Sequence, residues 1–294
     1  MKKLLIDRRG TILPVERGLR RIGRYKLPYD CDPLTFAIRD LGVIEVAFAE
    51  WGARVRLRPA IASSRAVSEL MYLLSDIRPR RFVLTHLQRT WEEELVPAFS
   101  PMVLRLEELV YGVRSRHPDK LFHAEDRSLD PDQSLMPAPF ARLLRQWIRR
   151  NGRLPDNATV PFRRSGCLGR TTLVEECDDS RMVIAFRGRH LTHYGTAGWT
   201  KYIGQPIDRQ PDIRFSSAAS AIYAEAHPRA APILQTCEGT IASPAGVGRR
   251  SIYERLILPW HLPDGRRVVS GVSHLRGRAD WKDARNLSES ASIS

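Results

Sequence analysis

The chain has 294 residues, of which 43% are hydrophobic and 27% are charged, a balance typical of globular proteins. A chain of this length most often forms one large domain or two ordinary ones, and disorder on a large scale is not expected. Its 47 Lys and Arg against 33 Asp and Glu give a net charge of +14, which favours contact with nucleic acid, acidic proteins or anionic lipid.

Membrane insertion and a disulfide framework are both excluded by the pattern of residues. No apolar stretch approaches the roughly 18 residues that a membrane span needs. The apolar part of Met1–Arg9 stops after three residues, too short for a signal peptide. We therefore expect a cytoplasmic protein without a membrane partner. Its widely spaced cysteines form no zinc ribbon and are expected to be reduced: Cys31, Cys167, Cys177 and Cys237.

The first part of the chain, residues 1–40, is basic and irregular in pattern and is predicted to be an N-terminal arm. Residues 41–115 are predicted to be a small mixed α/β domain with the order ββαβα. Its expected elements are a hairpin over Gly42–Arg58, a helix after Ser63, a strand over Arg81–His86, and a helix that starts at Thr90 and kinks at Pro97.

Three consecutive acids, Glu92, Glu93 and Glu94, follow His86 in this predicted domain and suggest a carboxylate metal site. Neighbouring residues on a helix point in directions about 100° apart, so the three carboxylates would diverge. We therefore interpret them as acids that complement the N-terminal end of the helix dipole, and we predict no metal site.

Residues 116–139 are polar and rich in Pro and Asp, and are predicted to be a linker. An amphipathic helix then spans Phe140–Arg150. Two strands, short elements, a helix of small residues and three more strands follow, over Thr171–Glu175, Arg181–Leu191, Ser216–Ala226, Pro232–Thr240, Arg250–Trp260 and Arg267–Leu275. Asp264-Gly265 is a strong hairpin signal between the last two strands. Residues 277–294 are predicted to be a polar tail.

The order of elements over residues 140–276 resembles the PAS fold, a five-stranded antiparallel sheet with helices on one face. The details are similar to compact PAS-like proteins found largely in alphaproteobacteria. The matching motifs are a Trp147 helix that ends near Leu154-Pro155, Leu173-Val174-Glu175, Ala185-Phe186-Arg187, Gly204 to Ile207, and Tyr253-x-Arg255-Leu256-x-Leu258-Pro259. The fold class is therefore predicted to be α+β, with the PAS-like domain after a small α/β domain.

The PAS resemblance implies a sensor or interaction module that binds a small ligand between sheet and helices, or contacts a protein partner or a second copy. The residues expected to line this cavity are Trp199, Tyr223, His227, Tyr253 and Trp260. The cofactor stays open. Some relatives hold haem through a histidine on the long helix, and His227 could serve, although a histidine at a helix end more often interacts with the helix dipole or with solvent. No cysteine has the setting of a photoactive flavin site.

No sequence motif of a known catalytic site is present, neither a P-loop, a nucleophile elbow, nor a dinucleotide fingerprint. His190-x-x-His193 lies at a predicted strand end without a third ligand, which favours polar surface over metal. We therefore expect a non-enzymatic sensory or interaction protein. The alternative is a nucleic-acid-associated regulator, which the net charge of +14 would suit.

Overall fold

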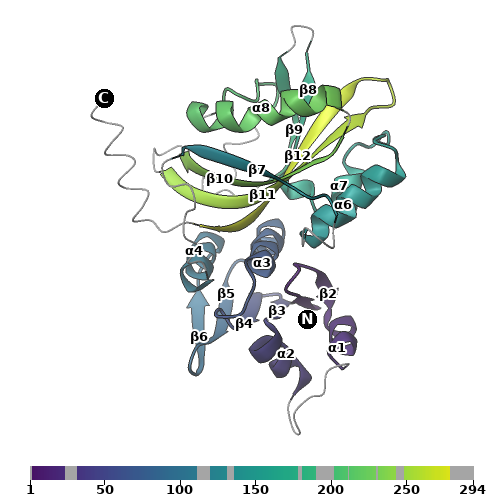
Figure 1. Ribbon diagram of the computed structural model, residues 1–294. Coiled ribbons are helices and arrows are strands. Elements are labelled where there is room, and N and C mark those ends of the chain that lie inside the picture. Colours follow the sequence, from purple (N-terminus) through teal and green to yellow (C-terminus); the bar gives the residue numbers. More distant parts are fainter. Residues whose placement is uncertain are drawn as a thin grey trace, which may run out of the picture. The chain divides into compact units, whose positions relative to one another are not determined.

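The computed structural model describes residues 2–23, 32–110, 120–130, 136–177, 181–189, 202–210, 212–229, 231–242 and 248–278. The chain divides into two compact units, Met1–Tyr111 and Gly112–Ser294. Each unit contains a six-stranded sheet (Figure 1). No helix within the described residues combines the length and the apolar character needed to cross a bilayer.

The sheet of the first unit is mixed, with the strand order β2-β1-β3-β4-β5-β6. All neighbouring strands are antiparallel except β4 and β5, which helix α3 connects. The elements are β1 (Lys2–Ile6), β2 (Ile12–Pro14), α1 (Val15–Ile22), α2 (Pro33–Leu41), β3 (Ile44–Ala49), β4 (Gly52–Leu57), α3 (Ser64–Ile77), β5 (Phe82–Leu87), β6 (Trp91–Val96) and α4 (Phe99–Val110).

The two faces of this first sheet are covered by different helices. Leu5 packs with Ile22, Ala37 and Val43 in a cluster to which α1 and α2 contribute. Because side chains alternate along a strand, Leu4 and Ile6 lie on the opposite face. There α3 contacts β1 and β3, and α4 contacts α3 and β6.

Two predictions for the first unit were wrong. Residues 2–23 are not an irregular arm, because they form β1, β2 and α1, whose lysines and arginines lie beside buried Leu5 and Ile6. Residues 91–96 are a strand and not a helix, and pair antiparallel with β5. Arginines offset the acids of this strand: Arg54 contacts Glu93, and Arg105 contacts Glu94.

The sheet of the second unit is antiparallel throughout, with the order β7-β10-β11-β12-β8-β9. The elements are β7 (Phe122–Arg127), α6 (Ala138–Arg149), α7 (Val160–Ser165), a 3-10 turn (Leu168–Arg170), β8 (Thr171–Glu176), β9 (Met182–Arg187), α8 (Ile213–Arg229), β10 (Ile233–Ala242), β11 (Gly248–His261) and β12 (Arg267–Arg278). The five predicted strands are β8 to β12, and the α+β class is as predicted.

Two further predictions for the second unit need correction. The sheet has a sixth strand, because β7, in the stretch predicted to be a linker, pairs with β10 from Phe122 to Arg127. Helices also cover both faces of the sheet and not one (Figure 1). The first cluster joins α6 and α7 to Leu256, Leu258 and Trp260. The second joins α8 to Ile257 and Val269.

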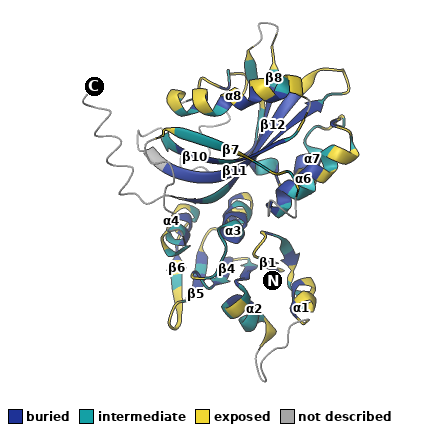
Figure 2. Ribbon diagram, viewed as in Figure 1, coloured by how far each residue is buried: buried dark blue, intermediate teal, exposed yellow. Residues whose placement is uncertain are grey.

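Burial along the central strands follows from this double cover. Every residue from Arg250 to Trp260 of β11 is buried, which Figure 2 shows as a dark strand through the sheet. A sheet with only one packed face would alternate between buried and exposed residues. Strand β11 therefore presents side chains to two separate layers, and consecutive residues of the strand lie in different layers.

Candidate ligand-binding site

The residues predicted to line a cavity fall in three places. Tyr223 of α8 and Tyr253 of β11 lie in the layer between α8 and the sheet. Trp260 lies on the opposite face, where its ring packs at 5.7 Å against Phe162 and its Nε1 donates to Ser270 Oγ at 2.9 Å. Trp260 is therefore core beneath α6 and α7. Trp199, and also His190 and His193, lie outside the described residues.

His227 lies one helical turn beyond Tyr223, near the end of α8. Its Nδ1 is 3.3 Å from Glu176 Oε2 at the end of β8, and 17% of its side chain is exposed. The structure thus gives His227 a local partner at the sheet end.

The centre of the layer under α8 is a row of polar residues that crosses three strands in register. Arg255 of β11 is opposite Gln235 of β10, and Gln235 is opposite Asp126 of β7. The Arg255 Nη2 donates to Gln235 Oε1 at 2.7 Å, and Gln235 Nε2 donates to Asp126 Oδ1 at 2.9 Å. The Arg255 Nη1 donates to the Ala219 carbonyl of α8. The row joins helix and sheet around one guanidinium.

The Arg255 guanidinium is buried, and no carboxylate of the described residues pairs with it directly. The residue is 4% exposed, and its Nε has no nitrogen or oxygen partner within the described part of the chain. Among the described residues, Asp126 reaches it only through the Gln235 amide. The Phe122 ring, 5.5 Å from the guanidinium carbon, offers a cation–π contact. Because buried charges are normally paired, this side chain is a candidate for pairing with an anion.

Three groups beside Arg255 stay protonated because of burial. Burial raises the pKa of the Tyr223 and Tyr253 phenols and of the Cys237 thiol. Tyr253 is opposite Cys237 in the next row of the sheet. The phenols are therefore neutral hydrogen-bond donors at neutral pH.

A second guanidinium lies at the other side of Tyr223. Arg187 of β9 donates to Gln210 Oε1 at 2.6 Å, and burial lowers its pKa to about 10. Arg187 and Arg255 both lower the pKa of Tyr223, although burial outweighs them. The layer therefore combines two cations with neutral donors. This combination suits a small carboxylate or phosphate, or a ring with polarised carbonyls.

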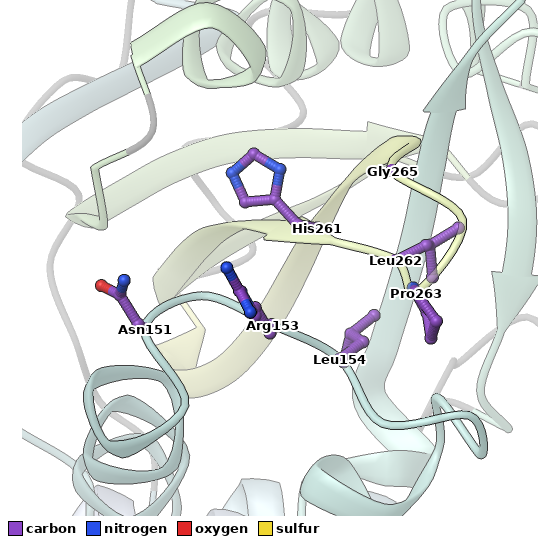
Figure 3. A pocket seen from close by; sticks show the side chains of 7 residues that line it. All are labelled: Asn151, Arg153, Leu154, His261, Leu262, Pro263 and Gly265. Atoms are coloured by element: carbon purple, nitrogen blue, oxygen red, sulfur yellow. The ribbon is translucent and has the colours of Figure 1, made fainter.

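A pocket of about 630 Å³ lies elsewhere in the second unit, at the end of the β11–β12 hairpin (Figure 3). The segment after α6 forms it by pairing with β11, since Leu154 N donates to the His261 carbonyl at 2.9 Å and His261 N donates to the Gly152 carbonyl at 2.8 Å. Figure 3 shows Leu262 and Pro263 at one side of the pocket, Asn151 at the other, and Arg153 between Asn151 and Leu154. Arg153 is exposed, so the pocket holds no desolvated cation comparable to Arg255.

The polar row was not predicted from the sequence, although a signal was present. Arg255 stands two positions after Tyr253 in a predicted strand, and residues with this spacing share a face. A tyrosine predicted to line the cavity therefore implied that Arg255 lines it too. Gln235 and Asp126 had no comparable signal, because only the registers of β10 and β7 bring them to Arg255.

No protein-family model matches the sequence, and no curated protein matches it. Among solved structures, the chain is similar to one described as an RNA-binding Light-Oxygen-Voltage receptor, with 14% identity over 65% of this chain. The chain spans 48% of that structure's chain, and the TM-score is 0.28. A superposition this loose supports no inference about function.

Proposed function

We propose that the second unit is a PAS-type sensory module in which the layer between α8 and the sheet binds a small anionic ligand. The observation that carries this proposal is the buried Arg255, whose nearest carboxylate is one amide away. The chain order of β8 to β12, which was predicted from the residue pattern and resembles that of PAS domains, supports the assignment of the fold. The ligand would complete the pairing of a charge that the described residues leave half satisfied.

The neutral neighbours of Arg255 favour binding over nucleophilic catalysis. A nucleophilic thiol or phenol needs a lowered pKa, whereas burial raises the pKa of Cys237, Tyr223 and Tyr253. These groups would orient an anion through hydrogen bonds and would not attack it. We accordingly propose a non-enzymatic module whose response passes to a protein partner or a second copy of the chain.

The test starts with native mass spectrometry and a visible absorption spectrum of freshly purified full-length protein. A bound mass, or a haem or flavin band, would identify the ligand. The protein is then compared with Arg255→Gln, and with Arg250→Gln as the control. Arg250 is also 4% exposed and on β11, but it pairs with Glu238 on the other face. We expect the ligand to be lost only from the Arg255 variant.

Protein without bound ligand is screened with carboxylates and phosphates by thermal unfolding, since a ligand that binds only the native state raises Tm. If no compound stabilises the protein, or if both variants respond like the parent, the anion site is refuted. The second unit would then be an interaction module, and its oligomeric state would be the next measurement.

The net charge of +14 supports a nucleic-acid partner as the second candidate function. Binding of this kind weakens steeply with salt, in proportion to the phosphates contacted. A titration of single- and double-stranded oligonucleotides at about 50 and 200 mM salt separates the candidates, because such a steep loss belongs to phosphate contacts. Absence of binding at the lower salt concentration would eliminate this candidate.

A further inference from the structure

The face of the first sheet that α3 and α4 cover becomes polar at the β5–β6 edge. His86 of β5 is directly opposite Glu92 of β6, and Leu84 is opposite Glu94. Side chains alternate along a strand, so Glu92 and Glu94 share the face of His86 while Glu93 points to the other face. There Glu93 accepts hydrogen bonds from Arg54 and Thr85. The divergence expected for a helix does not occur.

Three ligand atoms of metal-binding type converge at this end of the sheet. The His86 Nε2 lies 2.7 Å from Glu94 Oε1 and 3.9 Å from Glu92 Oε2, and all three atoms lie within 4.8 Å of one another. Ligands bound to zinc at about 2.0–2.1 Å in a tetrahedron are roughly 3.3 Å apart. An ion would therefore fit if the separations between the three ligand atoms changed by a few tenths of an ångström to about 1.5 Å.

The burial of the three side chains suits an ion that enters from solvent. The His86 side chain is fully buried, while 31% of Glu94 and 48% of Glu92 is exposed. A buried imidazole is held in a fixed direction by its surroundings, and its Nε2 faces both carboxylates. The exposed carboxylates leave a path to the site and room for a water molecule in a fourth position.

Arg105 of α4 orients Glu94 and does not neutralise the whole cluster. Its Nη2 and Nε donate to the Glu94 carboxylate at 2.7 and 2.9 Å, and its Nη1 donates to Glu108 at 2.7 Å. The Arg105 hydrogen bonds hold the Glu94 carboxylate on the side of the His86 Nε2. Arg105 is thus shared between Glu94 and Glu108, and Glu92 adds a further carboxylate beside His86. The remaining negative charge favours a cation.

We propose that His86, Glu92 and Glu94 bind a divalent transition-metal ion of the zinc class. A histidine with two carboxylates and an open position is a recurrent ligand set for such ions. Carboxylate ligands are themselves usually held by outer hydrogen bonds, and Arg105 supplies these for Glu94. The His86 Nδ1 has no hydrogen-bond partner among the described residues, and loss of such support typically lowers affinity by about 10–100-fold. We therefore expect weak binding, in the micromolar range.

The test compares the full-length protein with Glu92→Gln and Glu93→Gln. The two side chains are adjacent and similarly exposed, at 48% and 51%, but only Glu92 faces His86. Each protein is titrated with Co²⁺, followed by its visible d–d absorption, and then with Zn²⁺ as competitor. We expect one Co²⁺ site in the parent, an affinity at least about tenfold lower in Glu92→Gln, and no change in Glu93→Gln.

Folding of each variant is checked by far-UV circular dichroism, and both exposed positions are expected to tolerate glutamine. No saturable Co²⁺ absorption up to about 1 mM, far above the micromolar range expected, would overturn the proposal. Equal affinities of the two variants would also overturn it, because other histidines of the chain would then bind the ion. The first unit alone carries this site, so either outcome leaves the proposed function of the second unit untouched.

Discussion

Replacing Gly271 of β12 by alanine tests whether α8 lies on the sheet as described. A Cβ atom at this position would lie 1.9 Å from the Tyr223 hydroxyl oxygen, 2.7 Å from Cζ and 3.0 Å from Cε1. The φ angle of Gly271 is not in the left-handed region, so alanine meets no backbone strain there. The whole effect of the substitution comes from contact with one ring.

The expected loss in the free energy of unfolding is about 1–3 kcal/mol, the usual cost of overpacking a core. Tyr223 is 8% exposed and cannot turn away without moving α8. Tyr223→Ala alone should cost about 3–5 kcal/mol, by analogy with other aromatic truncations. In the double variant the new methyl group enters the space left by the ring, so alanine at 271 should cost nothing further. The expected coupling is therefore about 1–3 kcal/mol.

These free energies are measured by urea unfolding of the second unit, with hydrogen exchange of β11 and β12 peptides as the readout. Gly265→Ala serves as the control, because Gly265 has a φ of 87° and no atom within 4 Å of the new Cβ. Its cost comes from the turn backbone and should add to that of Tyr223→Ala within about 0.5 kcal/mol. If Gly271→Ala is equally additive with Tyr223→Ala, Tyr223 does not lie over Gly271.

Three more predictions concern single groups. Arg105 lowers the pKa of Glu94 from 4.5 to about 2. The ion pair therefore stabilises the fold at pH values above the unfolded pKa, and this stabilisation is lost as pH falls from about 4.5 towards 2. We expect Arg105→Gln to lower the free energy of unfolding by about 1–2 kcal/mol at pH 7, allowing for screening of the partly exposed pair, and by less near pH 3. Urea unfolding at both pH values measures this, and a loss that does not depend on pH would contradict it. Asp32 accepts from Thr35 N at 2.7 Å as the N-cap of α2, so Asp32→Ala should cost about 1 kcal/mol and Asp32→Ser much less by thermal unfolding; equal losses would exclude a capping role. Cys177 is exposed, whereas Cys237 is buried and has a raised pKa. Peptide mapping after brief iodoacetamide treatment should therefore find Cys177 alkylated far faster than Cys237. Similar rates for the two thiols would mean that the sheet opens readily.

The strands of the second unit were predictable because local signals agree with their tertiary roles. Apolar β-branched and aromatic residues dominate β8 to β12, and Asp264-Gly265 marks the turn, where Gly265 indeed has a positive φ. Strand β7 has no such signal. Its sequence Phe-His-Ala-Glu-Asp-Arg lacks apolar alternation, and its strand form depends on pairing with β10 at the sheet edge.

Strand β6 was predicted to be a helix for a physical reason. Trp91 and Leu95 are four residues apart, and the glutamates between them are good helix formers. The antiparallel pairing with β5 and the contacts of Arg54 and Arg105 override this local preference. The error also hid the convergence of Glu92 and Glu94 on His86. On a helix these two carboxylates would point in different directions, whereas on a strand residues two positions apart share a face.

The candidate site was predicted only as far as single residues allow. Tyr223 and Tyr253 were identified as buried aromatics. Trp260 lies on the opposite face of the sheet from Tyr253, because the two are an odd number of positions apart and an uninterrupted strand puts such residues on opposite faces. The row from Arg255 to Asp126 could not be found, because strand register depends on contacts between distant segments.

Strand β7 also sets the timing of assembly during synthesis. It leaves the ribosome before the rest of its sheet and must wait for β10, roughly a hundred residues later, for about 5–20 s at typical elongation rates. Until then its backbone has no strand to pair with, and closing so long a loop is a slow step for a sheet. A fragment that starts after Arg127 would skip this step but leave the Gln235 amide and the β10 edge open. The natural unit for recombinant expression therefore begins before Phe122.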